Sequence, residues 1–267
     1  MQQWVTGAPS MSTSLSLGKR RFLHVEVRSV PASQSIVWLR RGWEDLRQME
    51  RASLAHGVII SIIGAVLLML GSTHPYLIAA AVTGYLLVGP IMTTGVCELS
   101  RRRAAREPRG FDESLEAVTR NPDALMHFGG ILAVIAIVWF IASTVLLESI
   151  FGIRVPSLSV ALWGGAGDFA STREVIAYFS SGAIFAVTVF TLSVVAVPLI
   201  IDRHATAAEA MWASVKATLH NIPAMILWAA LIVGLTALGF VTLLLGMIVI
   251  APLLGHATWH AYRDLIG

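Results

Sequence analysis

The chain has 267 residues, of which 56% are hydrophobic and 13% charged, and its formal net charge is +3. Soluble domains are about a quarter charged, so this composition excludes an ordinary soluble protein and predicts one embedded in a membrane. The net positive charge does not indicate nucleic-acid binding, because the basic residues stand beside apolar blocks. The single cysteine, Cys97, excludes an internal disulfide and a cysteine-based metal site.

The chain begins with a polar stretch and continues into apolar blocks. Residues 1–24 are rich in Ser, Thr and Gly and lack the apolar run of a signal peptide. We expect a disordered tail there, followed by one transmembrane domain over residues 25–267. Six segments of that domain are predicted to cross the bilayer as helices, at roughly 54–70, 76–96, 125–147, 176–201, 222–237 and 239–254.

The last two predicted spans form one near-continuous apolar run. It is too long for a single crossing and barely long enough for two. Gly234 and Gly239 stand on either side of Thr236, which predicts a tight turn between the two spans. Earlier in the chain, Gly57, Ser61 and Ala65 recur every four residues, a spacing that lets lipid-embedded helices approach closely.

The charges of the loops predict the orientation. Seventeen of the nineteen Lys and Arg residues lie before the first span, after the second, after the fourth or after the sixth. The remaining two, Arg154 and Arg173, lie between the third and fourth spans. Because basic loops stay on the cytoplasmic side, both termini are predicted to be cytoplasmic in a bacterial inner membrane.

A weak repeat supports the count of six spans. Three times, a short amphipathic helix leads into a membrane hairpin, which gives an all-α polytopic bundle of three such units. The third amphipathic helix opens with Thr206 and Glu209, placed as a capping box. The apolar positions at helical spacing are Ile36, Leu39, Trp43 and Leu46 in the first helix; Phe111, Leu115 and Val118 in the second; and Ala208, Met211, Val215 and Leu219 in the third.

The first amphipathic helix is expected to contact the membrane surface. Aromatic side chains prefer the headgroup layer, and basic side chains are attracted to anionic lipids. The predicted surface residues are Trp38, Arg40, Arg41, Trp43 and Arg47. The expected partner is therefore the bilayer with its anionic cytoplasmic leaflet, and recruitment of a membrane-protein partner by the same helix stays open.

No Asp, Glu, Lys, Arg or His falls near the middle of any predicted span. A proton-coupled transporter with a buried carboxylate is therefore not expected. Ser181, Thr188 and Thr191 share roughly one face of the fourth span. We expect their hydroxyls to bond to the helix backbone or to a neighbouring helix, and a polar pathway is the alternative.

The weak candidates for a metal site lie at the ends of the spans. His256 and His260 are four residues apart, so a helix would place both rings on one side, as two metal ligands require. Convergence with Asp202, His204 and Glu98 would complete a site for zinc or iron. The alternative is that these histidines make interfacial hydrogen bonds. No cofactor is predicted, and no phosphate-binding loop or nucleophile elbow indicates an enzyme.

The motifs resemble an uncharacterised family of bacterial predicted integral membrane proteins, known only as a domain of unknown function. The resemblance covers about residues 25–267 and implies a multi-span inner-membrane protein without an established activity. It is carried by Val30-Pro31, Trp38-Leu39-Arg40-Arg41-Gly42-Trp43-Glu44-Asp45-Leu46, Gly89-Pro90, Glu98-Leu99-Ser100-Arg101-Arg102, Arg120-Asn121-Pro122, Pro198 with Asp202-Arg203, and Gly255-His256-Ala257-Thr258-Trp259-His260-Ala261-Tyr262-Arg263-Asp264-Leu265.

Three classes of function remain open. The first is a non-enzymatic accessory, scaffold or assembly component, which the absence of catalytic signatures and of buried charge favours. The second is a transporter or channel for a neutral or lipid-like solute, which the repeated hairpins favour. The third is a metal- or haem-linked membrane protein that uses His256 and His260.

Overall fold

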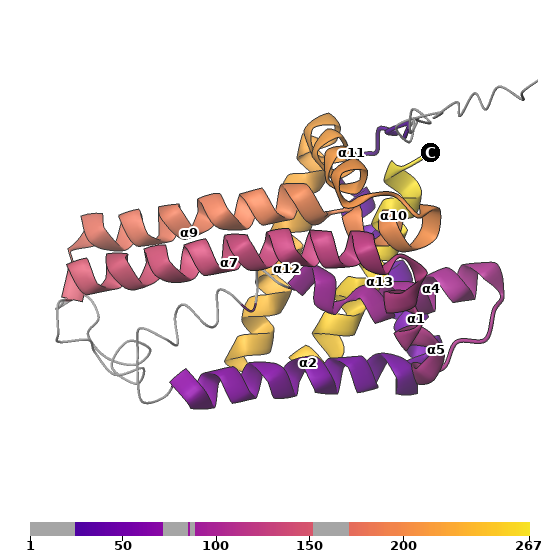
Figure 1. Cartoon of the computed structure of the whole chain (residues 1–267), viewed down its shortest axis with the longest axis horizontal. Coiled ribbons are helices and arrows are strands. Elements are labelled where there is room, and N and C mark those ends of the chain that lie inside the picture. Colours follow the sequence, from indigo (N-terminus) through magenta and orange to yellow (C-terminus); the bar gives the residue numbers. More distant parts are fainter. Residues whose placement is uncertain (1–24, 72–84, 86–88, 152–170) are drawn as a thin grey trace, which may run out of the picture.

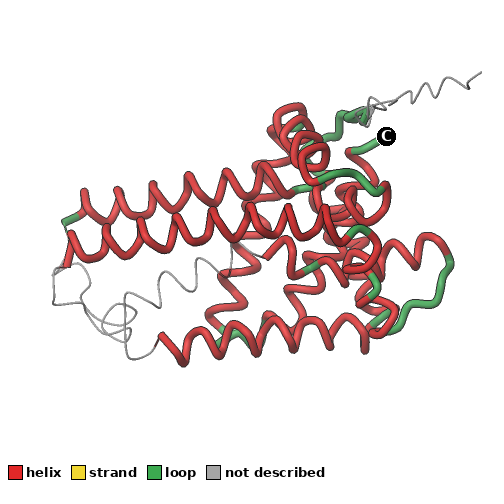
Figure 2. Tube along the Cα trace, viewed as in Figure 1, coloured by secondary structure: helices red, strands yellow, loops and turns green. Residues whose placement is uncertain are grey.

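The structure is a computed structural model that describes residues 25–71, 85, 89–151 and 171–267 (Figure 1). The expected tail and most of the predicted second span lie outside these residues. In the described part the named elements are all helices, as expected (Figure 2). They are α1 Gln34–Gln48, α2 Glu50–Gly71, α4 Thr94–Ala105, α5 Phe111–Leu115, α6 Ala117–Arg120, α7 Pro122–Phe151, α9 Thr172–Ser193, α10 Ala196–Arg203, α11 Ala207–His220, α12 Ile222–Val241 and α13 Met247–Leu265.

Four stretches of the described chain are long and apolar enough to cross a membrane. They match the predicted first, third, fourth and fifth spans and cover Glu50–Met69, Pro122–Ile150, Thr172–Arg203 and Ile222–Val241. The helices α2, α7 and α9 run along the long axis of the molecule, and α7 and α9 lie side by side (Figure 1). The third stretch contains both α9 and α10, and its break at Val194 and Val195 precedes Pro198, whose ring prevents a regular helix there.

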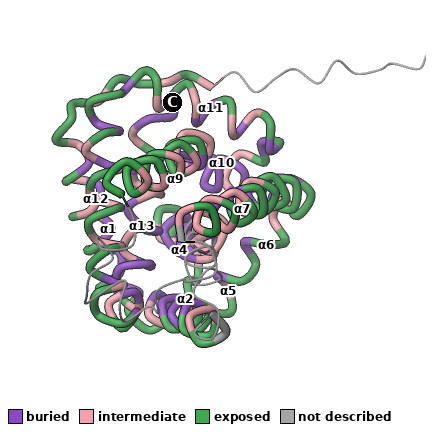
Figure 3. Tube along the Cα trace, turned by 90° about the vertical axis from the view of Figure 1, so that its left-hand side faces the viewer, coloured by how far each residue is buried: buried purple, intermediate pink, exposed green. Residues whose placement is uncertain are grey.

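The outer faces of these helices are apolar and exposed (Figure 3). Ile62 of α2 is 56% exposed, Ile141 of α7 57% and Ile226 of α12 65%. Lipid tails would cover such surface in a bilayer. The hydroxyls of Ser181 and Thr188 donate to the carbonyls of Tyr178 and Ile184 on their own helix, so the expected back-bonding is confirmed for these two residues.

The predicted turn of the last hairpin was wrong by about six residues. The helix α12 continues through Gly234 and Gly239, and the turn occupies residues 242–246. Leu243 and Leu244 adopt φ angles of 52° and 66° there, and the Thr242 hydroxyl accepts a hydrogen bond from the Gly246 amide at 2.9 Å. A glycine within a lipid-facing helix keeps its backbone hydrogen bonds, which an early turn in hydrocarbon would sacrifice. The predicted sixth span, 239–254, is replaced by α13, which starts at Met247 and ends at Leu265.

Helices α2 and α13 approach very closely. A Cβ atom on Gly57 would stand 1.9 Å from the carbonyl oxygen of Ile248, so only glycine fits at this crossing. One turn further along α2, the Ser61 hydroxyl donates to the Leu244 carbonyl at 3.1 Å. The expected packing role is therefore confirmed for Gly57 and Ser61, which contact α13 and the turn before it, whereas Ala65 is exposed.

The helix α1 packs against α13 through a face that the apolar spacing marks only in part. Its buried residues include Trp38, Gly42, Asp45 and Leu46, whereas Ile36 and Trp43 of the predicted apolar stripe are 57% and 44% exposed, as a helix on a membrane surface requires. The close contact is made by Gly42, whose Cβ would stand 2.8 Å from the Ala257 amide nitrogen. The predicted second helix is divided into α5 and α6.

The helix α11 packs through small residues and leaves Leu219 exposed. Its buried residues are Ala207, Ala210, Ala213, Ser214 and Ala217. The Ser214 hydroxyl donates to the Thr191 carbonyl of α9 at 2.7 Å, which ties α11 to a span. The predicted capping box of Thr206 and Glu209 is confirmed at its first turn.

The two ends of the described domain are joined. Val27 and Ile266 form an antiparallel bridge. The amide of Arg28 donates to the Leu265 carbonyl at 2.8 Å, and the amide of Gly267 donates to the Glu26 carbonyl at 2.9 Å. The segment before α1 is therefore held by the segment after α13.

Candidate functional site

Polar side chains from four helices meet in the protein interior at one end of the spans. We call this set the polar network. Its members are Asp45 of α1, Ser53 of α2, Ser100 and Arg103 of α4, and His256 and His260 of α13. Asp45, Ser53, Ser100 and His256 are buried. Each helix thus contributes at least one polar group where helix packing would otherwise be apolar.

Asp45 is the acceptor on which the polar network converges. Its Oδ2 accepts from the Ser100 hydroxyl at 2.5 Å and lies 3.1 Å from the His260 Nε2. Its Oδ1 pairs with the guanidinium of Arg103. Burial raises the pKa of Asp45, but the hydrogen bonds from His260 and Ser100 and the nearby His260 and His256 outweigh it, so the pKa lies below its ordinary value. The carboxylate is therefore ionised at neutral pH.

The tautomer of His256 follows from these partners. Ser100 has one hydroxyl proton and gives it to Asp45, so the Nδ1 of His256, 2.7 Å from the Ser100 oxygen, must donate. Burial lowers the pKa of His256 to about 3, so the ring is neutral and its Nε2 accepts from the Ser53 hydroxyl at 2.8 Å. Hydrogen bonds therefore run in one direction, from Ser53 through His256 and Ser100 to Asp45.

Acid is expected to destabilise the protein through His256. The unfolded histidine binds a proton near its ordinary pKa of 6.5, whereas the buried ring resists protonation down to about 3. Stability therefore falls as the pH drops through this window, by up to about 1.4 kcal/mol per pH unit. The lowered pKa of Asp45 adds a loss only below its ordinary value of 3.8. Thermal unfolding in mild detergent between pH 7.5 and 4.5 measures the effect.

The control for this pH dependence is His256→Gln. The variant should be less stable at neutral pH and should lose less stability on acidification, because glutamine does not titrate. Equal acid sensitivity in the two proteins would mean that another group is responsible. The comparison must be made within the pH range in which both proteins are folded.

Glu98 lies in a second buried cluster, separate in its partners from the polar network. Its carboxylate is fully buried and accepts from Arg101 at 2.8 Å through both oxygens and from Arg102 at 2.8 Å. The Arg120 guanidinium stands 3.6 Å away. Glu107 and Glu116 pair with Arg101 and Arg102, so three carboxylates balance three guanidinium groups. This ion cluster ties α4 to the segment that leads into α7.

The other two predicted metal candidates, Asp202 and His204, lie outside the polar network. Asp202 accepts from the Tyr262 hydroxyl at 2.6 Å, and His204 is exposed at a φ of 52° after α10. Among the described residues, no group of three or more His, Cys, Asp or Glu side chains is arranged to hold a metal ion. The structure brings only His256 and His260 into one network, and serine and Asp45 are their partners.

The predicted membrane-surface residues divide into two groups. Trp38 is an exception to the prediction, because it is fully buried and its indole nitrogen donates to Asp264 at 2.9 Å. Arg41 pairs with the same carboxylate at 3.1 Å. Arg40, Trp43 and Arg47 are exposed, as expected for a surface helix. Trp38 was misplaced because a tryptophan near an interface also fills the contact between two helices.

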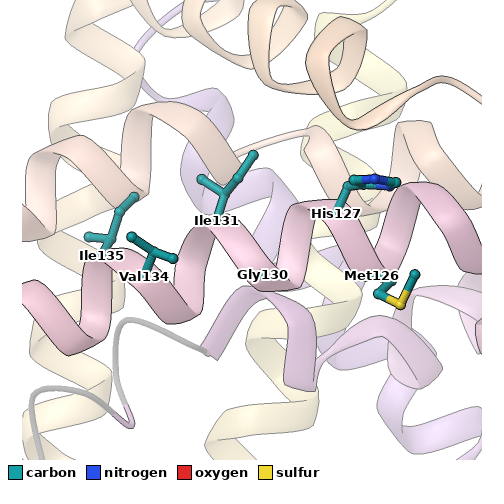
Figure 4. A pocket seen from close by; sticks show the side chains of 6 residues that line it. All are labelled: Met126, His127, Gly130, Ile131, Val134 and Ile135. Carbon is teal, nitrogen blue, oxygen red and sulfur yellow. The ribbon is translucent and has the colours of Figure 1, made fainter.

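The order of groups from Ser53 to Asp45 resembles that of a catalytic serine and its base. Ser53 and His256 are however buried, and neither of the two cavities described is lined by them. The larger, of about 460 Å³, is an open apolar groove along α7 lined by Met126, His127, Gly130, Ile131, Val134 and Ile135 (Figure 4). The polar network is therefore best explained as a connection between helices.

Sequence reasoning missed Asp45, Ser53, Ser100 and Arg103. A signal was available for Asp45, which lies seven residues after Trp38 and three after Gly42 and so shares their helix face. For the two serines no signal was available, because their importance depends on which helices are neighbours. A second missed pair is His56 and Ser114, 2.7 Å apart, which joins α2 to α5.

The comparisons with known proteins bear on the middle of the chain. Residues 77–202 match a family described as predicted integral membrane protein (DUF2189). No curated protein and no solved structure matches the chain. The match contains the motif around Glu98 and Arg101. The motifs around Trp43 and His256 lie outside the matched residues, so for these two motifs the resemblance stays a prediction. With its apolar helices of spanning length, the chain is a multi-pass integral membrane protein that is similar over residues 77–202 to the DUF2189 family.

Proposed function

We propose that the protein is a non-enzymatic accessory, scaffold or assembly component of a bacterial inner-membrane complex. The observation that supports this most concerns three buried ionisable side chains, which are all occupied by partners within the chain. Asp45, Glu98 and His256 have all their partners within the chain. Groups used in this way hold helices in place and are not available to a substrate.

The exposed face of α1 is the surface that we propose for the partner. Ile36, Arg40, Trp43 and Arg47 follow each other at intervals of four, three and four residues, which places them in one stripe along the helix. Apolar and basic side chains alternate in this α1 stripe. Exposed aromatic and arginine side chains of this kind are enriched in protein interfaces.

Purification from native membranes in gentle detergent, with mass spectrometry of co-purifying proteins, tests the proposal. We expect a stoichiometric partner with the wild-type protein and at least tenfold less of it with Trp43→Ala combined with Arg47→Glu. Both side chains are exposed, so the variant should fold. The matched control is Arg263→Glu, an exposed arginine on α13. Two results together would contradict the proposal. The protein would always purify alone, and every membrane complex would stay intact after the protein is deleted.

The same purification addresses the two alternatives. A protein that purifies without partner proteins but with a retained neutral small molecule would favour a transporter or channel. Coloured or metal-containing preparations would favour a metal- or haem-linked protein that uses His256 and His260. Neither of the two cavities described is lined by His256 or His260.

We also propose six crossings with both termini in the cytoplasm, on the basis of the loop charges. The two crossings beyond the four described would be formed by residues 76–96 and by the apolar first half of α13. Single cysteines introduced into a Cys97→Ser background test this topology. A membrane-impermeant maleimide should label Arg173→Cys in intact cells and Arg263→Cys only after the membrane is opened. The reverse pattern would overturn the orientation.

A further inference from the structure

A surface cavity of about 410 Å³, open to the outside, lies between the segment that precedes α1 and the last turns of α11. It is lined by Val25, Val27, Lys216, Leu219 and His220. Its two walls are tied together by Asn221, whose Oδ1 accepts from the Val30 amide at 2.8 Å and whose Nδ2 donates to the Arg28 carbonyl at 3.0 Å. Asn221 is 2% exposed, so this connection is protected from water.

The cavity combines basic and apolar groups without an acidic one. Within the described residues no carboxylate pairs with Lys216, whose ammonium lies 5.4 Å from the centre of the exposed Trp212 ring. Glu26 alternates with Val25 and Val27 along an extended segment, so its side chain points to the opposite side. An anion that enters the cavity therefore meets a cationic side chain that has no competing counter-ion.

The start of α12 indicates how far the cavity lies from the apolar layer of the membrane. In Figure 1, α11 is seen nearly end-on while α7 and α9 are seen from the side, so α11 crosses the direction of these two helices. The span α12 starts at Ile222, and Ile222 and Ile226 are 51% and 65% exposed. At 1.5 Å per residue, Lys216 is within about 10 Å of the apolar layer, which is the depth of lipid headgroups. Leu219, 63% exposed, adds apolar surface on the same side.

We propose that this cavity binds the headgroup phosphate of an anionic phospholipid. Lys216 donates to the phosphate oxygens together with His220, and Leu219 and Trp212 contact the glycerol and the start of the acyl chains. The proposal deepens the proposed function by naming a lipid partner, and it rests on that function only for the side of the membrane. A purely structural role is the competing explanation, because basic residues near the end of α11 also stabilise the helix dipole.

The test is native mass spectrometry of the purified full-length protein titrated with phosphatidylglycerol or with phosphatidylcholine. We expect the wild-type protein to prefer phosphatidylglycerol. Lys216→Gln should weaken that binding about fivefold, the equivalent of about 1 kcal/mol for one basic residue near an anionic surface. His220→Gln should weaken it less, and the control Arg263→Gln, which removes an exposed charge outside the cavity, should not change it.

Three outcomes would overturn the proposal. The first is that the wild-type protein shows no preference for phosphatidylglycerol, and the second is that Lys216→Gln and Arg263→Gln weaken lipid binding equally. The third is full displacement of the lipid by millimolar inorganic phosphate, which would mean that the site binds the free anion. A purely structural role would lower the thermal stability of Lys216→Gln equally with and without lipid. The protein partner is scored separately, so a Lys216→Gln variant that loses lipid and keeps its partner separates this proposal from the proposed function.

Discussion

Asp45→Asn is expected to lower the free energy of unfolding by about 3–5 kcal/mol, the usual cost of breaking a buried ion pair. The substitution leaves the Arg103 guanidinium and the His260 ring without their anionic partner. Ser100 still finds an oxygen acceptor, so the loss reports the charge more than the hydrogen bond. Denaturant or thermal unfolding in mild detergent measures it.

The neighbouring Glu44 provides a matched control. Glu44 pairs with Arg40 on the same helix, and the two side chains are 51% and 81% exposed. Exposed pairs contribute about 0–1 kcal/mol, so Glu44→Gln should unfold close to the wild-type protein. If the two variants unfold at the same point, the polar network does not hold the helices together.

Gly57→Ala is the second substitution with a large expected effect. The new methyl group would stand 1.9 Å from the Ile248 carbonyl oxygen, 2.6 Å from its carbon and 2.9 Å from its Cα, so the α2 and α13 backbones must move apart. Side chains cannot relieve a clash with backbone. We expect a loss of at least about 3 kcal/mol, at the upper end of overpacking effects, measured as yield of folded protein and as the unfolding midpoint.

Gly234→Ala is the control, and it also tests where the last hairpin turns. Nothing lies within 4 Å of the position that its Cβ would occupy, and Gly234 is within α12. Alanine is the better helix former, so stability should stay equal or rise slightly. A turn at residues 234–239 would instead make Gly234→Ala destabilising, and the position of the turn in the structure would then be wrong.

Much of the fold could be predicted because spanning helices carry their signal locally. The apolar run of α7 and the small residues Gly57 and Ser61 are examples, since each depends on a single stretch of sequence. The last turn was misplaced because glycine is ambiguous in a membrane: it permits a turn, and it also permits close packing in an unbroken helix. At residues 242–246 the positive φ angles fall on Leu243 and Leu244, whose side chains disfavour them, whereas the glycine of this turn, Gly246, has a negative φ angle, so the residue types do not identify the turn.

The candidate site was predictable only in part, because its partners come from distant segments. The spacing of His256 and His260 correctly suggested a shared helix face. Their partners lie 156 to 215 residues away in sequence, on three other helices. A serine or aspartate at such a distance has no local pattern that identifies it, and the same applies to Trp38, whose buried position depends on Asp264.

The contact between α1 and α13 has a consequence for how the chain folds during synthesis. Asp45 must remain without His260 until 215 further residues have been made. Closing so long a loop costs entropy before any contact rewards it, so this pairing is expected late. Until then Asp45 has only its α4 partners, Ser100 and Arg103, and Trp38 lacks Asp264, so this face of α1 stays incompletely covered. This end of the protein can therefore complete its packing only after α13 has been synthesised.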